Sequence, residues 1–153
     1  MGSSNAYWYI PDKIVFVHNV GDLTADNFRQ VDQQIISFMQ AAQEKGVDKV
    51  HVLVDSTEMR RLPPIRDLEN GRILKYMAEP NCGWTIVVGY RNNPFLSILS
   101  RLLASVMKVN LYMADTLSKG ISLLRQLEPS LTQMPAIEAW KQTHIPTQDD
   151  AGV

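Results

Sequence analysis

The chain has 153 residues, of which 45% are hydrophobic and 20% charged, and its net charge is −1. This composition is typical of one soluble globular domain and argues against a strongly basic surface for nucleic acid. The apolar runs are far shorter than the ~20 residues of a membrane-spanning helix, and the N-terminus lacks the pattern of a signal peptide. A single cysteine, Cys82, excludes an internal disulfide. We therefore expect a cytoplasmic protein without a membrane or nucleic-acid partner.

The first expected elements are a β-hairpin and a long helix. In AYWYIPDKIVFVHNVG, β-branched and aromatic residues flank Pro11-Asp12, a pair suited to a tight bend. Between Thr24 and Gly46, apolar residues recur three and four positions apart, as one face of a helix requires. Thr24 can cap the first turn of this helix, and Gly46 can end it.

Strands and helices then alternate along the chain. Three apolar runs predict buried strands, namely KVHVLVD, GWTIVVGY and VNLYMA. Pro63-Pro64 predicts the start of a helix over residues 65–79, and Asn93-Pro94 the start of another over 95–108. A last helix is expected over 115–127.

This order of elements predicts a single α/β domain. We expect a mixed, mostly parallel sheet of about five strands, with an antiparallel N-terminal hairpin and about four helices on its faces. The domain is expected to span residues 1–128. Residues 129–153 are expected to form a C-terminal extension, in which a short helix in PAIEAWKQTH docks Trp140 and the last residues are mobile.

The sequence lacks the common motifs of catalysis and metal binding. His18, His51 and His144 do not stand at a metal-ligand spacing, and no glycine-rich phosphate-binding motif or GxSxG motif occurs. Cys82 has no histidine nearby, which predicts a structural thiol rather than a nucleophile. We therefore expect no metal, no cofactor and no enzymatic activity.

The stretch VDSTEMRRLPPIRD contains the candidate site. Asp55 follows a predicted parallel strand, and ligands of α/β sheets usually bind at the carboxyl ends of such strands. Its neighbours Ser56 and Thr57 are able to cap a turn or accept a phosphate. The alternative interpretation is that Asp55 and Ser56 only bond to loop amides, as in an Asx-type turn.

Three arginines of the same stretch, Arg60, Arg61 and Arg66, offer a clamp for a phosphate or carboxylate near the start of the second helix. The segment 56–110 is net positive, whereas the rest of the chain is net negative. Both features favour an acidic partner or an anionic ligand. Scattered solvated charges and unliganded loop arginines are the alternative explanation.

The element order and several local strings resemble the STAS family, the domain of anti-sigma-factor antagonists and of the cytoplasmic portions of sulfate transporters. The similarity covers Tyr7 to Leu127 and is greatest to divergent stand-alone bacterial members. It is carried by the strings IVFVHNVGDLTADNF, KVHVLVDST, WTIVVG and LYMADTLSKGISLLRQL. CRAL-TRIO-type lipid-binding domains have a related topology.

The resemblance implies a STAS-like fold and a protein-binding switch, in which a partner kinase phosphorylates a serine at the start of the second helix. Here Pro63 to Asp67 occupy that place and contain no serine or threonine. The role of phospho-acceptor is therefore not carried over to Ser56 or Thr57.

Two functions follow as expectations. The first is a non-enzymatic regulatory module that uses residues 55–67 and the second helix to bind a protein partner, such as a regulatory kinase or an anti-sigma factor. The alternative is a small-ligand or lipid-binding domain, similar to CRAL-TRIO domains, with a crevice near Asp55, Arg60, Arg66 and Arg91. A homodimer contact through the hairpin edge or the apolar stripe of the helix at 95–108 is an alternative to burial of these surfaces in the core.

Overall fold

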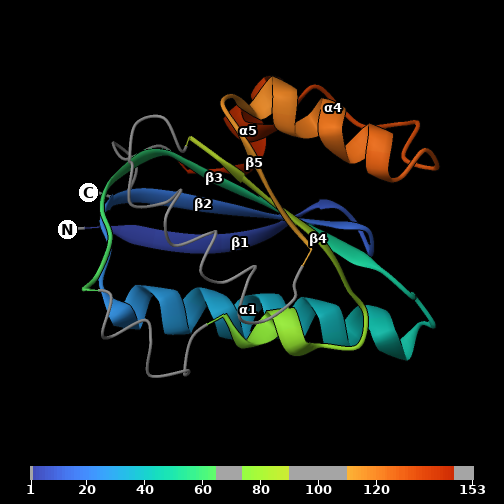
Figure 1. Cartoon of the computed structure of the whole chain (residues 1–153), viewed down its shortest axis with the longest axis horizontal. Helices are drawn as coiled ribbons and strands as arrows, with labels where there is room; N and C mark the ends of the chain where they lie inside the picture. Colours follow the sequence, from blue (N-terminus) through green and yellow to red (C-terminus); the bar gives the residue numbers. More distant parts are fainter. Residues whose placement is uncertain (1, 65–73, 90–109, 147–153) are drawn as a thin grey trace.

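Five strands form one sheet in the computed structural model, which describes residues 2–64, 74–89 and 110–146 (Figure 1). The strands lie side by side in the order in which they occur in the chain, β1-β2-β3-β4-β5. β1 runs antiparallel to β2, and all other neighbouring strands are parallel. The predicted α/β class and the mixed five-stranded sheet with its N-terminal hairpin are confirmed.

The hairpin consists of β1, Ser3–Ile10, and β2, Ile14–Asp22. Its turn places Asp12 in the left-handed region, with φ of 64°. An aspartate tolerates this conformation because its short polar side chain can bond locally. The N–H of Lys13 donates to the carbonyl of Ile10 at 3.0 Å and closes the turn.

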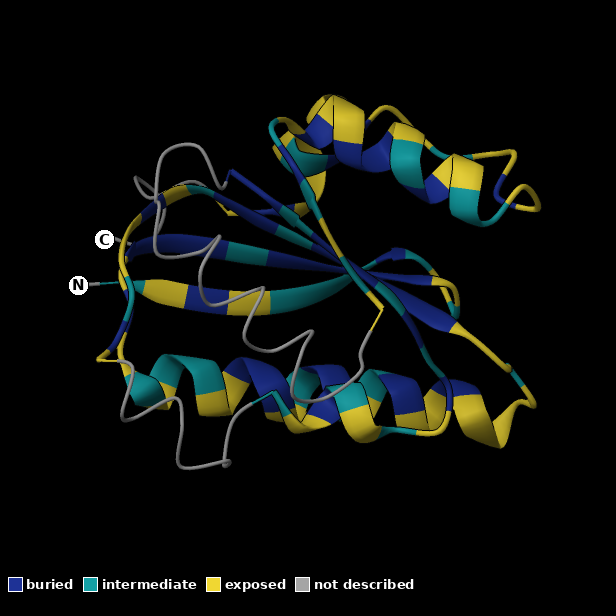
Figure 2. Ribbon diagram, viewed as in Figure 1, coloured by how far each residue is buried: buried dark blue, intermediate teal, exposed yellow. Residues whose placement is uncertain are grey.

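Helix α1, Ala25–Glu44, covers one face of the sheet, and its buried side is turned toward the strands (Figure 2). Oγ1 of Thr24 accepts a hydrogen bond from the N–H of Asn27, and the Asn27 side chain accepts one from the N–H of Thr24. Apolar residues of the helix pack on valines of β2 and β3, among them Val31, Ile35 and Met39. The predicted long helix is confirmed together with its cap.

Three parallel strands follow: β3, Val50–Arg61; β4, Cys82–Val88; and β5, Leu111–Ala114. Each coincides with a predicted strand, but β3 continues beyond Asp55. Between β3 and β4, the described residues include a short 3-10 helix, η1, Lys75–Ala78, where the sequence predicts the end of an α-helix.

Two of the predicted helices fall mainly or wholly on residues that the structure does not describe. The first part of the helix predicted over 65–79 and all of the helix predicted over 95–108 lie outside the described residues. The homodimer contact expected from the apolar stripe of the latter lies there too. The described ranges contain three α-helices, namely α1, α4 and α5.

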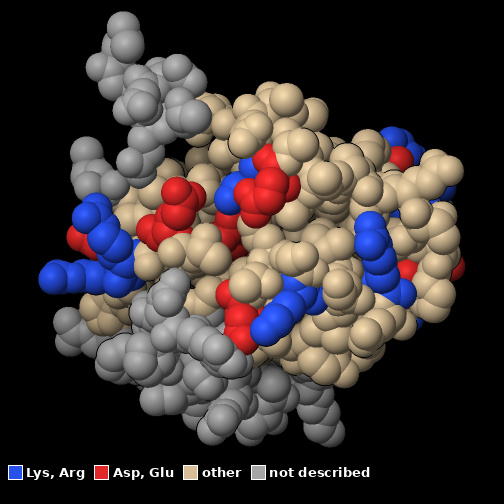
Figure 3. Space-filling model, turned by 90° about the horizontal axis from the view of Figure 1, so that it is seen from above, with Lys and Arg blue, Asp and Glu red and all other residues tan. Residues whose placement is uncertain are grey.

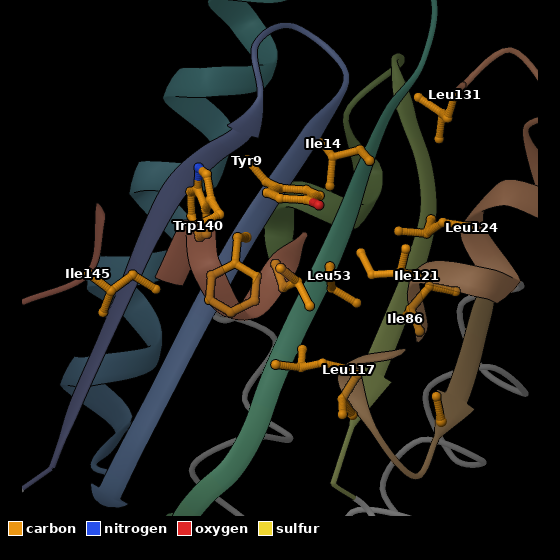
Figure 4. Packing of buried hydrophobic residues seen from close by; sticks show 14 residues of the cluster. Tyr9, Ile14, Leu53, Ile86, Leu117, Ile121, Leu124, Leu131, Trp140 and Ile145 are labelled. Atoms are coloured by element: carbon orange, nitrogen blue, oxygen red, sulfur yellow. The ribbon is translucent and has the colours of Figure 1, made fainter. Parts of the chain in front are cut away.

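Helices α4, Leu117–Leu127, and α5, Ile137–His144, cover the face of the sheet opposite α1 (Figure 1). Their apolar side chains join those of the strands in one cluster, in which Leu117, Ile121 and Leu124 lie over Leu53 and Ile86 (Figure 4). The helix predicted over 115–127 and the short helix that docks Trp140 are both present. No helix within the described ranges is long and apolar enough to cross a bilayer.

Candidate functional site

β3 ends at Arg61 rather than at Asp55 because its second half continues to pair with β2. Glu58, for example, lies opposite Val20. The residues after Asp55 that the sequence assigns to a loop therefore belong to a strand as far as Arg61, and residues 62–64 are the first without regular structure. The predicted placement of Asp55 at an open strand end is wrong.

A β-bulge interrupts the pairing of β2 with the extended part of β3. The register shifts between His18 and Val20, so that Asn19 lies opposite both Ser56 and Thr57. A bulge adds one residue to a strand and bends it locally. Here the extra residue allows Thr57 to bond back to Asp55, while Ser56 bonds to Asn19.

The carboxylate of Asp55 is fully buried, and both of its oxygens accept hydrogen bonds. The residue is 0% exposed. Its Oδ1 accepts hydrogen bonds from the backbone N–H of Thr57 at 3.1 Å and from the Thr57 hydroxyl at 2.6 Å. Its Oδ2 accepts one from Nζ of Lys141, in α5, at 2.8 Å. The bonds from Thr57 are those of an Asx-type turn, which is one of the two interpretations offered by the sequence.

The charge on Asp55 is stabilised by its partners. Burial acts to raise the pKa of Asp55, but the hydrogen bonds from Lys141 and Thr57 outweigh it and hold this pKa below its ordinary value. A buried ion that is both paired and hydrogen-bonded is tolerated, whereas the same ion without its partner is strongly destabilising. In this conformation the carboxylate of Asp55 binds Lys141 of α5 and is not accessible to a ligand.

The sequence gives little indication of Lys141, which lies 86 positions after Asp55 in the chain. One usable signal is its neighbour Trp140, because a residue next to a docked aromatic side chain is held near the sheet. Trp140 packs edge-on against Tyr9 and Phe16, with ring centroids 5.1 and 5.3 Å apart (Figure 4). This packing places Lys141 beside Asp55.

Ser56 belongs to a buried chain of polar side chains. Oγ of Ser4 donates to Oδ1 of Asn19 at 2.5 Å, and Nδ2 of Asn19 donates to Oγ of Ser56 at 3.1 Å. All three residues are buried. Ser56 thus links β3 to β2 and β1, and a kinase has no access to its hydroxyl in this conformation.

Charged side chains project from the last residues of β3. Nε2 of His18 and Oε2 of Glu58 lie 2.6 Å apart, and the Glu58 side chain is 57% exposed. Arg60 and Arg61 are exposed, and Nε of Arg60 lies 3.9 Å from Oδ1 of Asp22. The end of β3 therefore presents both signs of charge to the surroundings.

Figure 3 shows lysine and arginine side chains standing out at the left end of the molecule, where β2 and β3 finish. Of the predicted anion-binding residues, Arg60 and Arg61 lie at this end. Arg66 and Arg91 lie outside the described residues. The structure thus separates the predicted site into a buried part at Asp55 and Ser56 and an exposed part at the arginines.

A second polar cluster lies at the opposite ends of the strands, beside a surface hollow of about 400 Å³. Nδ1 of buried His51 accepts a hydrogen bond from the N–H of Trp84 at 2.9 Å, and its Nε2 lies 3.2 Å from Oε2 of Glu128. The Ser130 hydroxyl donates to Oε1 of Glu128 at 2.9 Å. This order does not suit nucleophilic catalysis, because the serine contacts the carboxylate rather than the histidine that would have to accept its proton.

Neither a metal centre nor a reactive thiol is evident in the described parts of the chain. No group of three or more His, Cys, Asp or Glu side chains there is placed to hold a metal ion. Burial raises the pKa of Cys82 to about 11, which disfavours the thiolate that a nucleophile or metal ligand requires.

No family model matches the chain, and a search of curated proteins finds no significant match. A proposal of function therefore rests on the geometry described above and on the resemblance noted in the sequence.

Proposed function

We propose that this chain is a non-enzymatic, STAS-like regulatory domain that binds a protein partner through the exposed end of β3. The observation that supports this role is the exposure of Arg60 and Arg61 on a strand that is paired with β2 as far as its end. A paired strand loses little conformational entropy when it docks. Arginine also binds carboxylates in a bidentate manner, which favours a partner with an acidic surface. A regulatory kinase or an anti-sigma factor is the class of partner suggested by the resemblance.

A non-enzymatic role is favoured by the bonding of the candidate acid–base groups. The carboxylate of Asp55 is paired with Lys141 beneath α5. Both ring nitrogens of His51 are engaged, one by a backbone N–H and the other by Glu128. Asp55 and His51 are also buried, so a substrate does not reach either group in this conformation.

The test is a comparison of charge-reversal variants. We expect Arg60→Glu and Arg61→Glu each to weaken binding of the partner about tenfold or more, because each places a repulsive charge in a site for an acidic surface. Arg125→Glu is the matched control, since Arg125 is also exposed but lies on α4. Tagged wild-type chain would be cross-linked in its host to identify the partner, and affinities would then be measured with purified proteins by calorimetry. Equal affinities for all the variants would refute the proposal.

A small-ligand or lipid-binding role is the alternative function. The carboxylate of Asp55 is fully buried and bonded to Lys141 of α5, so a ligand reaches it only if α5 moves. A thermal-melt screen of anionic and apolar compounds tests this role, because a ligand that binds the folded state raises the melting temperature. The absence of any shift would argue against it.

A further inference from the structure

Helix α5 has little means of holding its own shape. It contains 8 residues, whereas isolated helices shorter than about 12–15 residues are marginal in water. No side chain caps its N-terminus at Ala136, and residues 128–136, which join it to α4, contain no helix or strand. Its helical form therefore depends on its packing against the sheet.

The sheet beneath α5 does not depend on it in the same way. β1, β2 and β3 pair directly with one another through their backbones. α5 contributes the buried side chains of Ile137 and Trp140 to the cluster on this face, where Trp140 rests on Tyr9 and Phe16, and a cation, Lys141, that meets Asp55. The helix can leave without breaking a backbone hydrogen bond of these strands.

The ion pair makes the attachment of α5 depend on charge. With Lys141 in place, the buried carboxylate of Asp55 is neutralised. Without the cation, a closed α5 would enclose an unpaired carboxylate, whereas a lifted α5 would leave that carboxylate hydrated. Loss of the pair should therefore lift the helix before it unfolds the sheet.

We propose that α5 is a displaceable strap, and that the groove beneath it, formed by Tyr9, Phe16 and Asp55, binds a segment of a protein partner that carries an aromatic residue next to a lysine or arginine. The strap itself shows which chemistry fits the groove: the indole ring of Trp140 packs on Phe16, and the ammonium group of Lys141 binds the carboxylate of Asp55. This groove is a second surface, separate from the exposed end of β3. The inference goes beyond the proposed function and does not rest on it.

Hydrogen exchange of the full-length chain tests the strap. We expect Lys141→Ala to speed exchange in residues 137–144 about tenfold or more, while the amides of β2 and β4 keep their protection. Adding Asp55→Asn to this variant should restore protection, because no charge is then enclosed. Lys119→Ala removes the ion pair between an exposed lysine of α4 and Asp115, far from α5 in the chain, and should have no such effect. Unchanged exchange in Lys141→Ala, or equal loss of protection in α5 and the strands, would overturn the proposal.

A peptide with the sequence PAIEAWKQTHIP, residues 135–146, serves as the probe for the groove. The protein for this test is the full-length Lys141→Glu variant, in which we expect the repulsion between two carboxylates to lift the strap. We expect this variant to bind the labelled peptide at least about tenfold more tightly than wild type does, because the wild-type strap competes within the same molecule. Peptides with alanine in place of the tryptophan or the lysine should not bind.

Failure of the intact peptide to bind Lys141→Glu would overturn the docking groove. That failure is distinguishable from failure of the proposed function, because peptide binding should be unaffected by Arg61→Glu. Partner binding at the end of β3 is measured separately with Arg60→Glu and Arg61→Glu.

Discussion

Nδ1 of His51 accepts a hydrogen bond from the backbone N–H of Trp84 at 2.9 Å, so the ring proton lies on Nε2, which faces Glu128. The neutral ring thus forms a hydrogen bond through each nitrogen. Protonation would place a hydrogen on Nδ1, which would then repel the backbone N–H of Trp84. Burial lowers the pKa of His51, and the hydrogen bond with Glu128 only partly offsets this effect. The histidine is held neutral inside the fold.

Stability should therefore fall as the pH drops below 6.5, the ordinary pKa of a histidine. The unfolded chain binds a proton at His51 near that pH, but the folded chain does so only at lower pH. Because the unfolded state then carries more protons, the free energy of unfolding decreases as the pH falls. Urea denaturation between about pH 7.5 and about pH 5.5 measures this slope.

His51→Gln is the control for this pH dependence, because it retains His18 and His144 and removes only the buried ring. The hydrogen bond from Ser130, followed by the interactions with His51, lowers the pKa of Glu128, so Glu128 stays ionised throughout the window. We expect the variant to show a clearly shallower slope. Identical slopes for wild type and His51→Gln would contradict the assignment.

β4 passes so close to the ring of His51 that a side chain at position 83 has no room. A Cβ atom on Gly83 would lie 2.5 Å from Nδ1 of His51. Because the ring is held by hydrogen bonds on both sides, Gly83→Ala should lower the free energy of unfolding by about 1–3 kcal/mol. Chemical denaturation measures this cost. In a His51→Ala background most of it should vanish, and a cost that persists there would refute the clash.

Asp32 of α1 holds η1 in place. Its Oδ2 accepts from the N–H of Lys75 and its Oδ1 from the N–H of Tyr76, each at 3.0 Å. Asp32→Ala would remove the acceptor of both donors and should lower the free energy of unfolding by about 1–3 kcal/mol. Gln33→Ala changes the exposed neighbour on the same helix and should have an effect within about 0.5 kcal/mol. Similar melting curves for the two variants would disprove this role.

Ser56 provides a test of the phosphorylation hypothesis. Because its hydroxyl is buried against Asn19, Ser56→Asp would enclose a charge without a cation and should destabilise the fold by about 2 kcal/mol or more. Ser122→Asp, at an exposed position of α4, should be nearly neutral. Thermal unfolding of both variants measures the difference. A stable, well-folded Ser56→Asp protein would return Ser56 to the list of candidate acceptors.

Much of the fold could be predicted from the sequence because its signals are local. The cap at Thr24 and the apolar stripe of α1 depend only on residues within the same helix. The strand Cys82–Val88 likewise follows from its own apolar run. Such elements need no knowledge of their neighbours in space.

The candidate site could be predicted only in part because it depends on pairs that are distant in the chain. The polar residues from Ser56 to Arg61 resemble a loop, and their strand conformation comes from pairing with β2. The partner of Asp55 lies in α5, and no local pattern identifies Lys141 as that partner. The sequence therefore predicts Asp55 as a candidate site residue but does not predict that its carboxylate is buried.

The sequential order of the strands has a consequence for how the nascent protein folds on the ribosome. Each strand pairs with the one synthesised before it, so the sheet can grow by adding one strand at a time as translation proceeds. The carboxylate of Asp55 enters the sheet early, but its counter-ion emerges 86 positions later. We therefore expect the assembled sheet to carry a hydrated acidic group on its surface until α5 docks and excludes that water.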